Sequence, residues 1–400
     1  MPQSRRTFLA GSTALLATTR TAWSIPAPTR SASGGQIDPW IEIDPAALLH
    51  NLRVVARYAG GRPLLAVVKN NAYGLGLREV GTVLDGAAEV GGFAVVRAGE
   101  ALALRQVGVR KPILLMARCT EAEAVEAVRH DIQLALFDDD APAWCRAVRQ
   151  AAGKPVRGQL YLDTGMARLG RPLERSREWL DRLRDAGVVF EGAFTELTED
   201  RDFDREQVAR LGQFAAEARG RGIVVGPLHA ASSMAVMHQP ETHLALVRPG
   251  FALYGGYVSR AIAEQAELVP AFRLRAGVVR MERLETGQGV SYHRRWKATR
   301  PTWVATLPLG YVDGYLAEAV KGCEVLIGGR VYPVVGTVSA SHTLVAIGDE
   351  PSVRVGDVAT LIGPDHPAIH PHTIATRTGT SEYGVYFKLS PLVPRVVLDT

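Results

Sequence analysis

Lys69 ends a run of apolar residues, 63–69, and is followed by the polar and small residues Asn-Asn-Ala-Tyr-Gly-Leu-Gly. Burial disfavours the charged form of a lysine and lowers its pKa. A lysine that is partly deprotonated near neutral pH can form a Schiff base with a carbonyl compound, and the glycines after it let the backbone approach a ligand. For Lys69 alone, a side chain that reaches past the strand end into water is the more common explanation, so the surrounding elements must decide.

Eight short apolar runs alternate with amphipathic segments over the first two thirds of the chain. The runs are 63–69, 92–96, 111–116, 132–137, 158–163, 190–195, 224–230 and 244–249. Continuous apolar runs are typical of strands buried on both faces, and segments 46–58, 121–130 and 205–219 have helical spacing. Alternating strands and helices predict a parallel sheet, and eight repeats predict a (β/α)₈ barrel of the TIM type, whose site lies at the carboxyl ends of its strands.

After about residue 272 the pattern changes to short β-like runs separated by glycine and proline. These runs are 274–284, 303–309, 323–327, 330–335, 344–347, 357–362 and 393–398. They predict a mostly antiparallel β domain. We therefore expect an α/β barrel domain over 44–272 and a C-terminal β domain over 273–400, with the strand 40–43 paired to the second.

Three further barrel strands end in segments that suit a ligand. The segments are DTGMARLG after the fifth run, HAASS after the seventh and VRPGFALYGG after the eighth. Loops after the seventh and eighth strands of such barrels often bind phosphate through backbone N–H groups and hydroxyls. A lysine and a phosphate-binding segment at the same end of a barrel indicate pyridoxal 5′-phosphate (PLP) chemistry.

The N-terminus, residues 1–34, resembles a bacterial twin-arginine signal peptide followed by a flexible leader, with Arg5 and Arg6 before a short apolar run. A disordered basic tail is the alternative. These residues contain four arginines and no lysine, aspartate or glutamate, so their removal lowers the formal net charge from +5 to +1. We expect a periplasmic protein with no membrane segment in its mature form. No basic stripe indicates nucleic-acid binding.

The composition excludes several other classes of protein and site. Hydrophobic residues make up 47% and charged residues 22% of the chain, which is typical of a globular protein rather than a disordered one. The three cysteines, Cys119, Cys145 and Cys323, lack zinc-ligand spacing, and one pair of them can still form a disulfide. The histidines at 366, 370 and 372 lie in a proline-rich segment without cysteine or acidic partners, so we expect a polar loop and no metal site.

Six motifs resemble the alanine racemase family in the family's order, over about residues 40–400. They are AVVKNNAYGLG, LDTGMARLG, VRPGFALYG, GVSYHRRW, LPLGYVDG and SPLVPRV. The resemblance implies PLP-dependent racemisation of free amino acids by two bases. It also implies a head-to-tail homodimer in which each active site combines the barrel of one chain with the β domain of the other.

The resemblance also implies roles for individual residues. Lys69 matches the lysine that binds PLP and exchanges the α-proton on one face, and Tyr292 matches the tyrosine that serves the opposite face from the partner subunit. Arg248 matches the arginine at the pyridine nitrogen, to which it cannot donate a proton. Arg168 matches the arginine beside the PLP phenolic oxygen and the substrate carboxylate. The phosphate-binding positions are Tyr73, Ser233, Gly250, Phe251 and Tyr383. Each aromatic or arginine, taken singly, also fits a packed ring or a surface ion pair.

Several positions depart from the family pattern. Tyr161 stands where the family commonly has a carboxylated lysine that orients the arginine matching Arg168, a role that an anion such as chloride takes in some broad-specificity relatives. Glu196 replaces the histidine behind the pyridine-facing arginine. Ala340 replaces a methionine whose backbone N–H meets the substrate carboxylate; the N–H survives, and the lost side chain opens volume. The other departures are Leu75, Ser232 and Ser341. The change at Ala340 predicts a broad or non-alanine specificity.

Two other functions remain open from the sequence. One is a PLP lyase or decarboxylase on the same fold, and Tyr292 argues against it because decarboxylation needs no second base. The other is a degenerate, non-catalytic protein that binds PLP or an amino acid, which the changes at Tyr161, Glu196 and Ala340 suggest.

Overall fold

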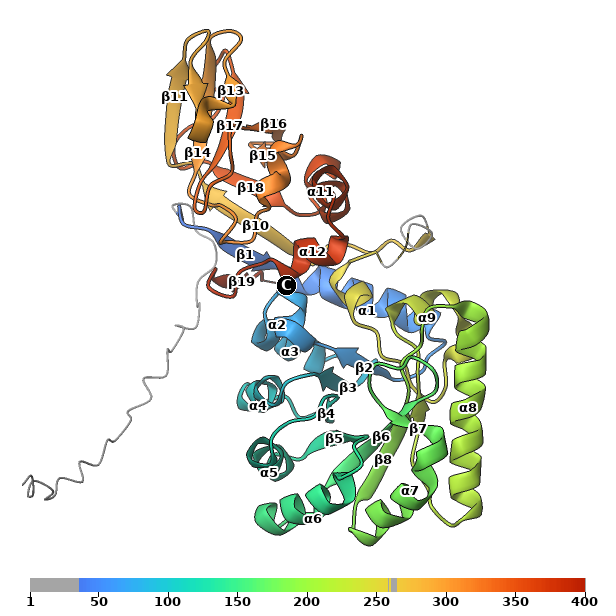
Figure 1. Cartoon of the computed structure of the whole chain (residues 1–400). Helices are drawn as coiled ribbons and strands as arrows, with labels where there is room; N and C mark the ends of the chain where they lie inside the picture. The colour runs from blue at the N-terminus through green and yellow to red at the C-terminus, as the bar shows by residue number, and fades with distance from the viewer. Residues whose placement is uncertain (1–35, 258, 260–264, 400) are drawn as a thin grey trace, which may run out of the picture.

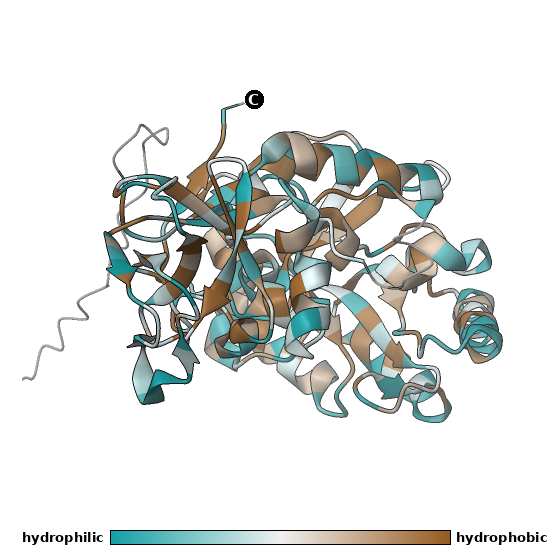
Figure 2. Cartoon of the chain, turned by 90° about the horizontal axis from the view of Figure 1, so that it is seen from above, coloured by the Kyte–Doolittle hydropathy of each residue, from teal (hydrophilic) through white to brown (hydrophobic). Residues whose placement is uncertain are grey.

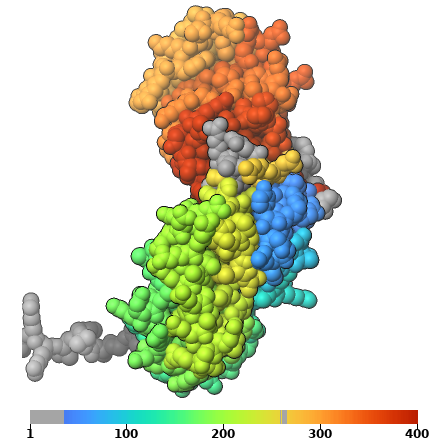
Figure 3. All heavy atoms as spheres, turned by 90° about the vertical axis from the view of Figure 1, so that its right-hand side faces the viewer, coloured from blue at the N-terminus to red at the C-terminus, as the bar shows by residue number. Residues whose placement is uncertain are grey.

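The computed structural model describes residues 36–257, 259 and 265–399. In Figure 1 a parallel sheet with surrounding helices forms the lower part of the molecule and an antiparallel sheet forms the upper part. Figure 3 shows the two parts from the side, with the C-terminal residues in orange and red above the green and yellow barrel. The predicted fold class is therefore confirmed. The predicted signal peptide and leader, 1–34, lie outside the described residues.

The parallel sheet curls into the predicted barrel. Its strands are β2 (Leu64–Val67), β3 (Val90–Val95), β4 (Ile113–Leu115), β5 (Ile132–Leu136), β6 (Arg157–Asp163), β8 (Val189–Phe194) and β9 (Leu228–His229), and the short β7 (Arg171–Pro172) pairs with β6. Neighbouring strands pair in parallel in this order. All five residues of β5 are buried, as expected for a strand covered on both faces.

Two of the predicted strands differ from the structure. The run 224–230 contributes only the two residues of β9, because Pro227 lacks an N–H and Gly226 has a φ of +85°, which ends regular pairing. The run 244–249 forms isolated parallel bridges, Leu64 to Val247 and His229 to Leu246, instead of a strand. Hydrogen bonds from the Leu65 N–H to the Val247 carbonyl and from the Ala245 N–H to the Leu228 carbonyl still close the barrel.

Helices cover the outside of the barrel. They are α1 (Pro45–Tyr58), α3 (Leu77–Asp85), α4 (Ala98–Gln106), α5 (Glu121–Arg129), α6 (Ala141–Ala152), α7 (Ser176–Asp185), α8 (Arg201–Gly220) and α9 (Ser233–His238), with short 3₁₀ turns η1 (Leu173–Arg175), η2 (Pro240–Thr242) and η3 (Phe251–Tyr254). The short element α2 (Lys69–Tyr73) follows β2 at the carboxyl end of the barrel and is a left-handed turn. Figure 2 shows hydrophobic colour along the strands and hydrophilic colour on the outer turns of the helices.

The ends of these helices follow from local chemistry. Thr120 and Glu123 form a capping box that starts α5. The Asp44 carboxylate accepts a hydrogen bond from the Ala47 N–H and Pro45 is the first residue of α1. The predicted helix 205–219 begins earlier, at Arg201, because Asp200 accepts a hydrogen bond from the Phe203 N–H and caps it.

The C-terminal part contains a mixed, mostly antiparallel sheet. Within the described residues its strand order is β11–β14–β17–β16–β15–β18–β10–β1–β19. The bounds are β1 (Trp40–Ile43), β10 (Phe272–Gly277), β11 (Arg280–Leu284), β14 (Thr302–Leu307), β15 (Glu324–Ile327), β16 (Arg330–Val335), β17 (Thr343–Gly348), β18 (Val358–Ile362) and β19 (Arg395–Val397). The expected pairing of β1 with this sheet is confirmed, since β1 pairs with β10 and β19. The predicted single run 274–284 is two strands, because β10 pairs with β18 and β11 with β14.

Smaller elements complete this part. They are the hairpin β12 (Gly289–Val290) and β13 (Trp296–Lys297), the helices α11 (Pro371–Thr378) and α12 (Glu382–Phe387), and the 3₁₀ turns η4 (Tyr292–Arg294), η5 (Ala317–Val320) and η6 (Pro367–Ile369). The segment around His366 and His370 is more ordered than the predicted polar loop. Each ring accepts a backbone N–H through its Nδ1 atom, at the start of η6 and α11 respectively.

Cys119, Cys145 and Cys323 are all free. In the described ranges no group of three or more His, Cys, Asp or Glu residues has an arrangement that suits a metal ion. None of the described helices has the length and hydropathy needed to cross a bilayer.

Candidate active site

Lys69 is followed by a turn with left-handed backbone. The φ angles of Asn70, Asn71, Ala72 and Tyr73 lie between 51° and 57°. Asparagine tolerates this conformation, whereas alanine and tyrosine adopt it at a cost of about 1 kcal/mol or more each. The sequence predicted unusual backbone conformations at the glycines of this segment. It did not predict this turn, because the left-handed residues precede Gly74.

Contacts from both parts of the chain hold this turn. The Asn71 N–H donates to the Glu100 carboxylate at 3.1 Å, and the Asn71 Oδ1 accepts from the Leu77 N–H at 2.9 Å. Arg395 of β19 donates to the Gly74 carbonyl at 2.6 Å. The C-terminal part therefore fixes the loop that carries Lys69.

A cavity of about 350 Å³ opens at the carboxyl ends of the barrel strands. Eight of the predicted site residues line it together: Lys69, Tyr73, Arg168, Ser233, Arg248, Gly250, Phe251 and Tyr383. Other lining residues include Tyr161, Phe194, Glu196 and Glu199. The loops after the first, fifth, seventh and eighth predicted strands thus meet at one place, as the barrel topology predicts.

The surroundings of Lys69 lower its pKa from the ordinary value of 10.5. Burial is the largest cause, and Arg168 and Arg248 add to it, while Glu196 and Glu100 act in the opposite direction. A lysine with a lowered pKa is unprotonated in a larger fraction of molecules and is a better nucleophile toward a carbonyl.

Ser233 organises one corner of the cavity. Its Oγ accepts hydrogen bonds from the Gly250 N–H at 2.9 Å and the Ala252 N–H at 3.3 Å. A Cβ atom on residue 250 would collide with the Tyr73 hydroxyl, so only glycine fits there. The Tyr383 ring stacks on Phe251 with centroids 3.8 Å apart. Two backbone N–H groups and the Ser233 and Tyr73 hydroxyls thus gather at this corner, beside the Tyr383 ring.

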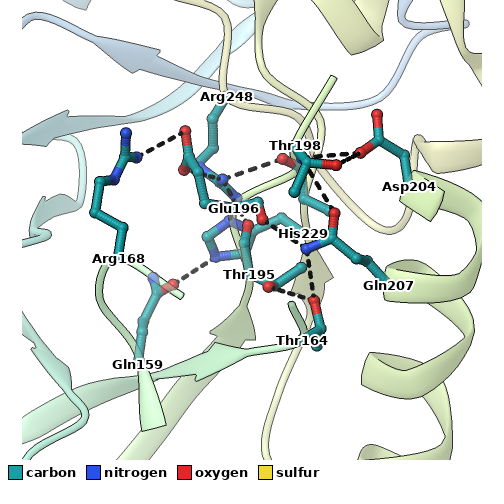
Figure 4. A network of polar contacts seen from close by, with 11 residues as sticks. Gln159, Thr164, Arg168, Thr195, Glu196, Thr198, Asp204, Gln207, His229 and Arg248 are labelled. Carbon is teal, nitrogen blue, oxygen red and sulfur yellow. Dashed lines mark hydrogen bonds and ion pairs between the residues drawn. The ribbon is translucent and has the colours of Figure 1, made fainter. Parts of the chain in front are cut away.

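Arg248 is almost completely buried, and both of its Nη atoms donate hydrogen bonds (Figure 4). Its Nη1 donates to His229 Nδ1 at 2.9 Å, and its Nη2 donates to the Thr195 carbonyl at 2.8 Å. His229 Nε2 lies 2.6 Å from Gln159 Oε1, and Gln159 Nε2 donates to Gln133 Oε1. Because Arg248 only donates, these bonds make His229 an acceptor at Nδ1 and a donor at Nε2. Burial and the Arg248 charge lower the His229 pKa well below 6.5, so the ring stays neutral.

Glu196 lies between two arginines, as Figure 4 shows. Its Oε2 is 3.1 Å from Arg248 Nη2 and its Oε1 is 3.7 Å from Arg168 Nη2. The segment that carries it is anchored to α8, because Asp204 and Gln207 accept hydrogen bonds from the Thr198 N–H. These bonds fix the backbone near Glu196 relative to α8.

Tyr292 and Ala340 lie elsewhere, on the C-terminal part. They line a second hollow of about 580 Å³ together with Tyr311, Ser341 and neighbouring residues, and neither lines the Lys69 cavity. Tyr292 is 66% exposed. A single chain therefore does not bring these two predicted residues to Lys69.

Family models match both parts of the chain: "Alanine racemase, N-terminal domain" over residues 43–258 and "Alanine racemase, C-terminal domain" over residues 271–397. The chain belongs to the alanine racemase family. A relative called alanine racemase from Methanococcus maripaludis is 32% identical over 90% of this chain and 98% of its own length, and one from Geobacter sulfurreducens is 33% identical over 90% and 96%.

Solved alanine racemases share the fold. The crystal structure of alanine racemase from a D-cycloserine-producing Streptomyces lavendulae has a TM-score of 0.84 and 28% identity, covering 92% of this chain and 98% of that one. The alanine racemase from Bacillus anthracis with bound L-Ala-P has a TM-score of 0.81 and 26% identity, covering 92% and 97%. The alanine racemase family comprises PLP-dependent racemases, and this chain is one of them.

The cavity fits PLP by its own chemistry. It offers a lysine with a lowered pKa, a corner of hydroxyls and backbone N–H groups next to a glycine that a side chain would block, and a buried arginine. Lys69 would hold the aldehyde carbon and the Ser233 corner would hold the phosphate.

One residue of this alanine racemase site, His229, was not predicted from the sequence. His229 begins the motif HAASS, yet its contact with Arg248 was not predicted. A histidine at the end of a buried strand was the available signal, but its partner lies 19 residues further on and only the closed barrel brings the two together.

Proposed function

We propose that this racemase interconverts the L and D forms of free amino acids with Lys69 and Tyr292 as its two bases. The observation that carries the proposal is the Lys69 cavity, where a lysine of lowered pKa lies with two arginines and the Ser233 corner. When bound, PLP supplies an electron sink that acidifies the proton on the α-carbon. The chain's residues then orient the substrate and move that proton.

Each base works on one face of the α-carbon. The Lys69 amine removes or returns the proton on one face, and the Tyr292 hydroxyl does so on the other. Arg168 binds the substrate carboxylate. Arg248 would face the pyridine nitrogen of PLP without protonating it, because a guanidinium does not give up its proton in proteins. Hydrogen bonds from its Nη groups to His229, Thr195 and Glu196 hold it in place.

The site is completed by a head-to-tail homodimer in this proposal, with Tyr292 supplied by the partner's C-terminal domain (273–400 with strand 40–43) to the barrel domain (44–272). The exposure of Tyr292 and its separation from the Lys69 cavity support this arrangement. Mixing the inactive variants Lys69→Ala and Tyr292→Phe tests it. Random re-association restores about a quarter of the parental activity if the sites are shared between subunits, because half of the dimers then hold one intact site. No recovery contradicts sharing.

The proposed specificity is broad or directed to amino acids other than alanine. Ala340 has a smaller side chain than the methionine that the family resemblance places there, and it lines the same hollow as Tyr292. The test is kcat/KM for alanine, serine, lysine, arginine and methionine, in the parental enzyme and in Ala340→Met. We expect the variant to lose activity on the larger substrates. A strict preference of the parental enzyme for alanine contradicts the proposal.

The same assays separate racemisation from other activities. Chiral chromatography shows a D-amino acid from a racemase and an amine or keto product from a decarboxylase or lyase. Exchange of the α-hydrogen in deuterated water is absent from a protein that only binds its ligands.

We also propose twin-arginine export to the periplasm, from Arg5, Arg6 and the short apolar run that follows them. This route carries folded proteins, so PLP is loaded before transit. A fusion of residues 1–35 to a reporter that must fold before export tests this. Cytoplasmic retention of the fusion with both arginines intact contradicts it.

A further inference from the structure

We propose that Glu196 is a positioning residue that aligns Arg168 for the substrate carboxylate and balances the charge of Arg248, so that the enzyme needs neither a carboxylated lysine nor a bound anion for this purpose. The inference rests on the proposed role of Arg168 as the carboxylate-binding group. It assigns to a side chain of the chain itself a function that a modification or an ion would otherwise supply.

The first observation is the gathering of positive charge. Lys69, Arg168 and Arg248 all line the same cavity. Arg248 is buried, with only 3% of its side chain exposed, so its charge is costly unless an anion lies close. Glu196 meets this need, because its Oε2 lies 3.1 Å from Arg248 Nη2.

The second observation concerns Arg168, whose side chain is 58% exposed and therefore has many accessible rotamers. Glu196 is the only described carboxylate that forms an ion pair with it, through Oε1 at 3.7 Å from Nη2. A single carboxylate thus touches both arginines with different oxygens. This arrangement orients Arg168 relative to the fixed Arg248.

The neighbouring acidic groups among the described residues serve other purposes. Glu100 accepts hydrogen bonds from the Asn71 and Val96 N–H groups. Asp163 accepts from the Gly165 and Ala167 N–H groups and holds its own turn. The remaining acid that lines the cavity, Glu199, has a pKa raised by burial and by Asp204 and Glu196, so its charged form is disfavoured.

The position of the expected carboxylated lysine is closed to that chemistry. Tyr161 is buried there and its ring stacks on Phe194 with centroids 4.4 Å apart. Burial raises the Tyr161 pKa and Glu196 acts in the same direction, while the charges of Arg168 and Arg248 and a hydrogen bond with Arg168 act against them. The phenol is neutral, so Tyr161 contacts Arg168 without supplying an anion. The negative charge beside Arg168 therefore comes from Glu196.

The anchoring of Glu196 agrees with a positioning role. Its backbone carbonyl accepts a hydrogen bond from Gln207 Nε2 at 3.0 Å, and Thr195 before it bonds to Thr164 through the hydroxyls. The loop is therefore tied to both α8 and β6. A glutamate whose backbone is held in this way loses less entropy when its side chain orients a long arginine.

The test compares the PLP-loaded parental enzyme with Glu196→Gln, which keeps size and loses charge, and Glu196→Asp, which keeps charge. We expect Glu196→Gln to raise KM for the amino acid several-fold with a smaller change in kcat, because the ion pair that orients Arg168 is lost. Glu196→Asp should recover part of this loss. The pH midpoint of the visible absorption of bound PLP should fall by about one pH unit in Glu196→Gln, because an anion that stabilises nearby positive charge is gone.

The second arm measures dependence on small anions. The parental enzyme should keep its activity in chloride-free, bicarbonate-free buffer, whereas Glu196→Ala should regain several-fold activity when formate is added to fill the vacated space. Glu199→Gln is the matched control, since it removes an acid from the same cavity that pairs with neither arginine among the described residues. It should show no response to formate.

The outcomes separate this inference from the proposed function. A parental enzyme that loses activity without chloride or bicarbonate, or a Glu196→Gln variant with parental KM and absorption, overturns the role of Glu196 while racemisation stands. Absence of α-hydrogen exchange in the parental enzyme overturns the proposed function itself. Because Glu196→Gln is isosteric and its PLP content is measured directly, a folding failure of Glu196→Ala leaves the first arm decisive.

Discussion

Glu382 at the start of α12 is a carboxyl group whose replacement by glutamine should stabilise the protein at alkaline pH. It lies next to Tyr383, which lines the Lys69 cavity. Its Oε2 is buried and accepts no hydrogen bond from the described residues, although His372 Nδ1 lies 3.4 Å away. Its Oε1 accepts one bond, from the Tyr257 N–H at 3.4 Å. Burial raises its pKa from 4.5 to about 7, against the smaller effect of the Tyr257 bond.

The sign of the effect follows from the raised pKa. Below pH 4.5 the carboxyl is protonated in both the folded and unfolded chains, so it costs nothing. Between pH 4.5 and 7 the unfolded chain loses the proton first, and stability falls as pH rises. Above pH 7 the full cost is present. At about 1.4 kcal/mol for each pH unit between the two pKa values, this cost reaches about 3 kcal/mol.

Glu382→Gln removes the ionisation and keeps the oxygen that accepts from Tyr257. We expect the variant to gain up to about 3 kcal/mol in free energy of unfolding at pH 8, and to match the parental protein at pH 4.5. Urea titrations of the PLP-loaded protein at both pH values measure this difference. Glu350→Gln, at an exposed position, is the control. It should have the same free energy of unfolding as the parental protein at both pH values. An equal effect of Glu382→Gln at both pH values, or a loss of stability at pH 8, refutes the reasoning.

Three further variants test the site. Lys69→Ala should lose both racemase activity and the visible absorption of covalently held PLP, and retention of that absorption after desalting contradicts the assignment. Tyr292→Phe should impair α-hydrogen exchange mainly from one enantiomer, because only one face loses its base; comparable losses from both, measured separately in deuterated water, argue against it. His229→Leu removes one hydrogen-bond partner from each of the buried side chains Arg248 and Gln159, so it should cost about 3 kcal/mol in urea unfolding and weaken PLP retention, and parental values for both contradict the network.

Much of the fold could be predicted from periodicity, and the errors have local causes. The apolar runs located the barrel strands because strands covered on both faces are apolar throughout. The run 244–249 was misassigned as a regular strand, since its residues bridge to β2 and β9 without extended pairing. An apolar run indicates that a segment is buried, but it does not show that the segment pairs as a regular strand. Leu246 and Val247 close the barrel through isolated bridges.

The residues of the candidate site were predicted mainly by their match to family motifs, and less by the placement of polar residues at strand ends. Strand ends alone placed Lys69 and the phosphate-binding segments near one another, but the roles of Arg168 and Tyr292 came from the family resemblance. Hydrogen-bond chains are invisible in the sequence. The path from Arg248 through His229 and Gln159 joins the run 244–249 to β9 and β6, and only the closed barrel shows it. The Glu196 position was noticed as a departure, and its double contact required coordinates.

The C-terminal part has two separate functions in the proposed dimer, and they place different demands on it. Arg395 of β19 binds the Gly74 carbonyl, and a Cβ atom on residue 74 would collide with the Tyr386 carbonyl, so this part packs closely against the Lys69 loop of its own chain. Tyr292 is presented on an exposed turn for the site of the other chain. The first function needs rigid contact and the second needs a free surface. One sheet runs from β19 through β1 and β10 to β16, and the Ser291 hydroxyl, just before η4, donates to the Thr337 carbonyl, just after β16. A substitution that loosens β1 should therefore disturb both active sites at once, whereas one in η4 should affect only the partner's.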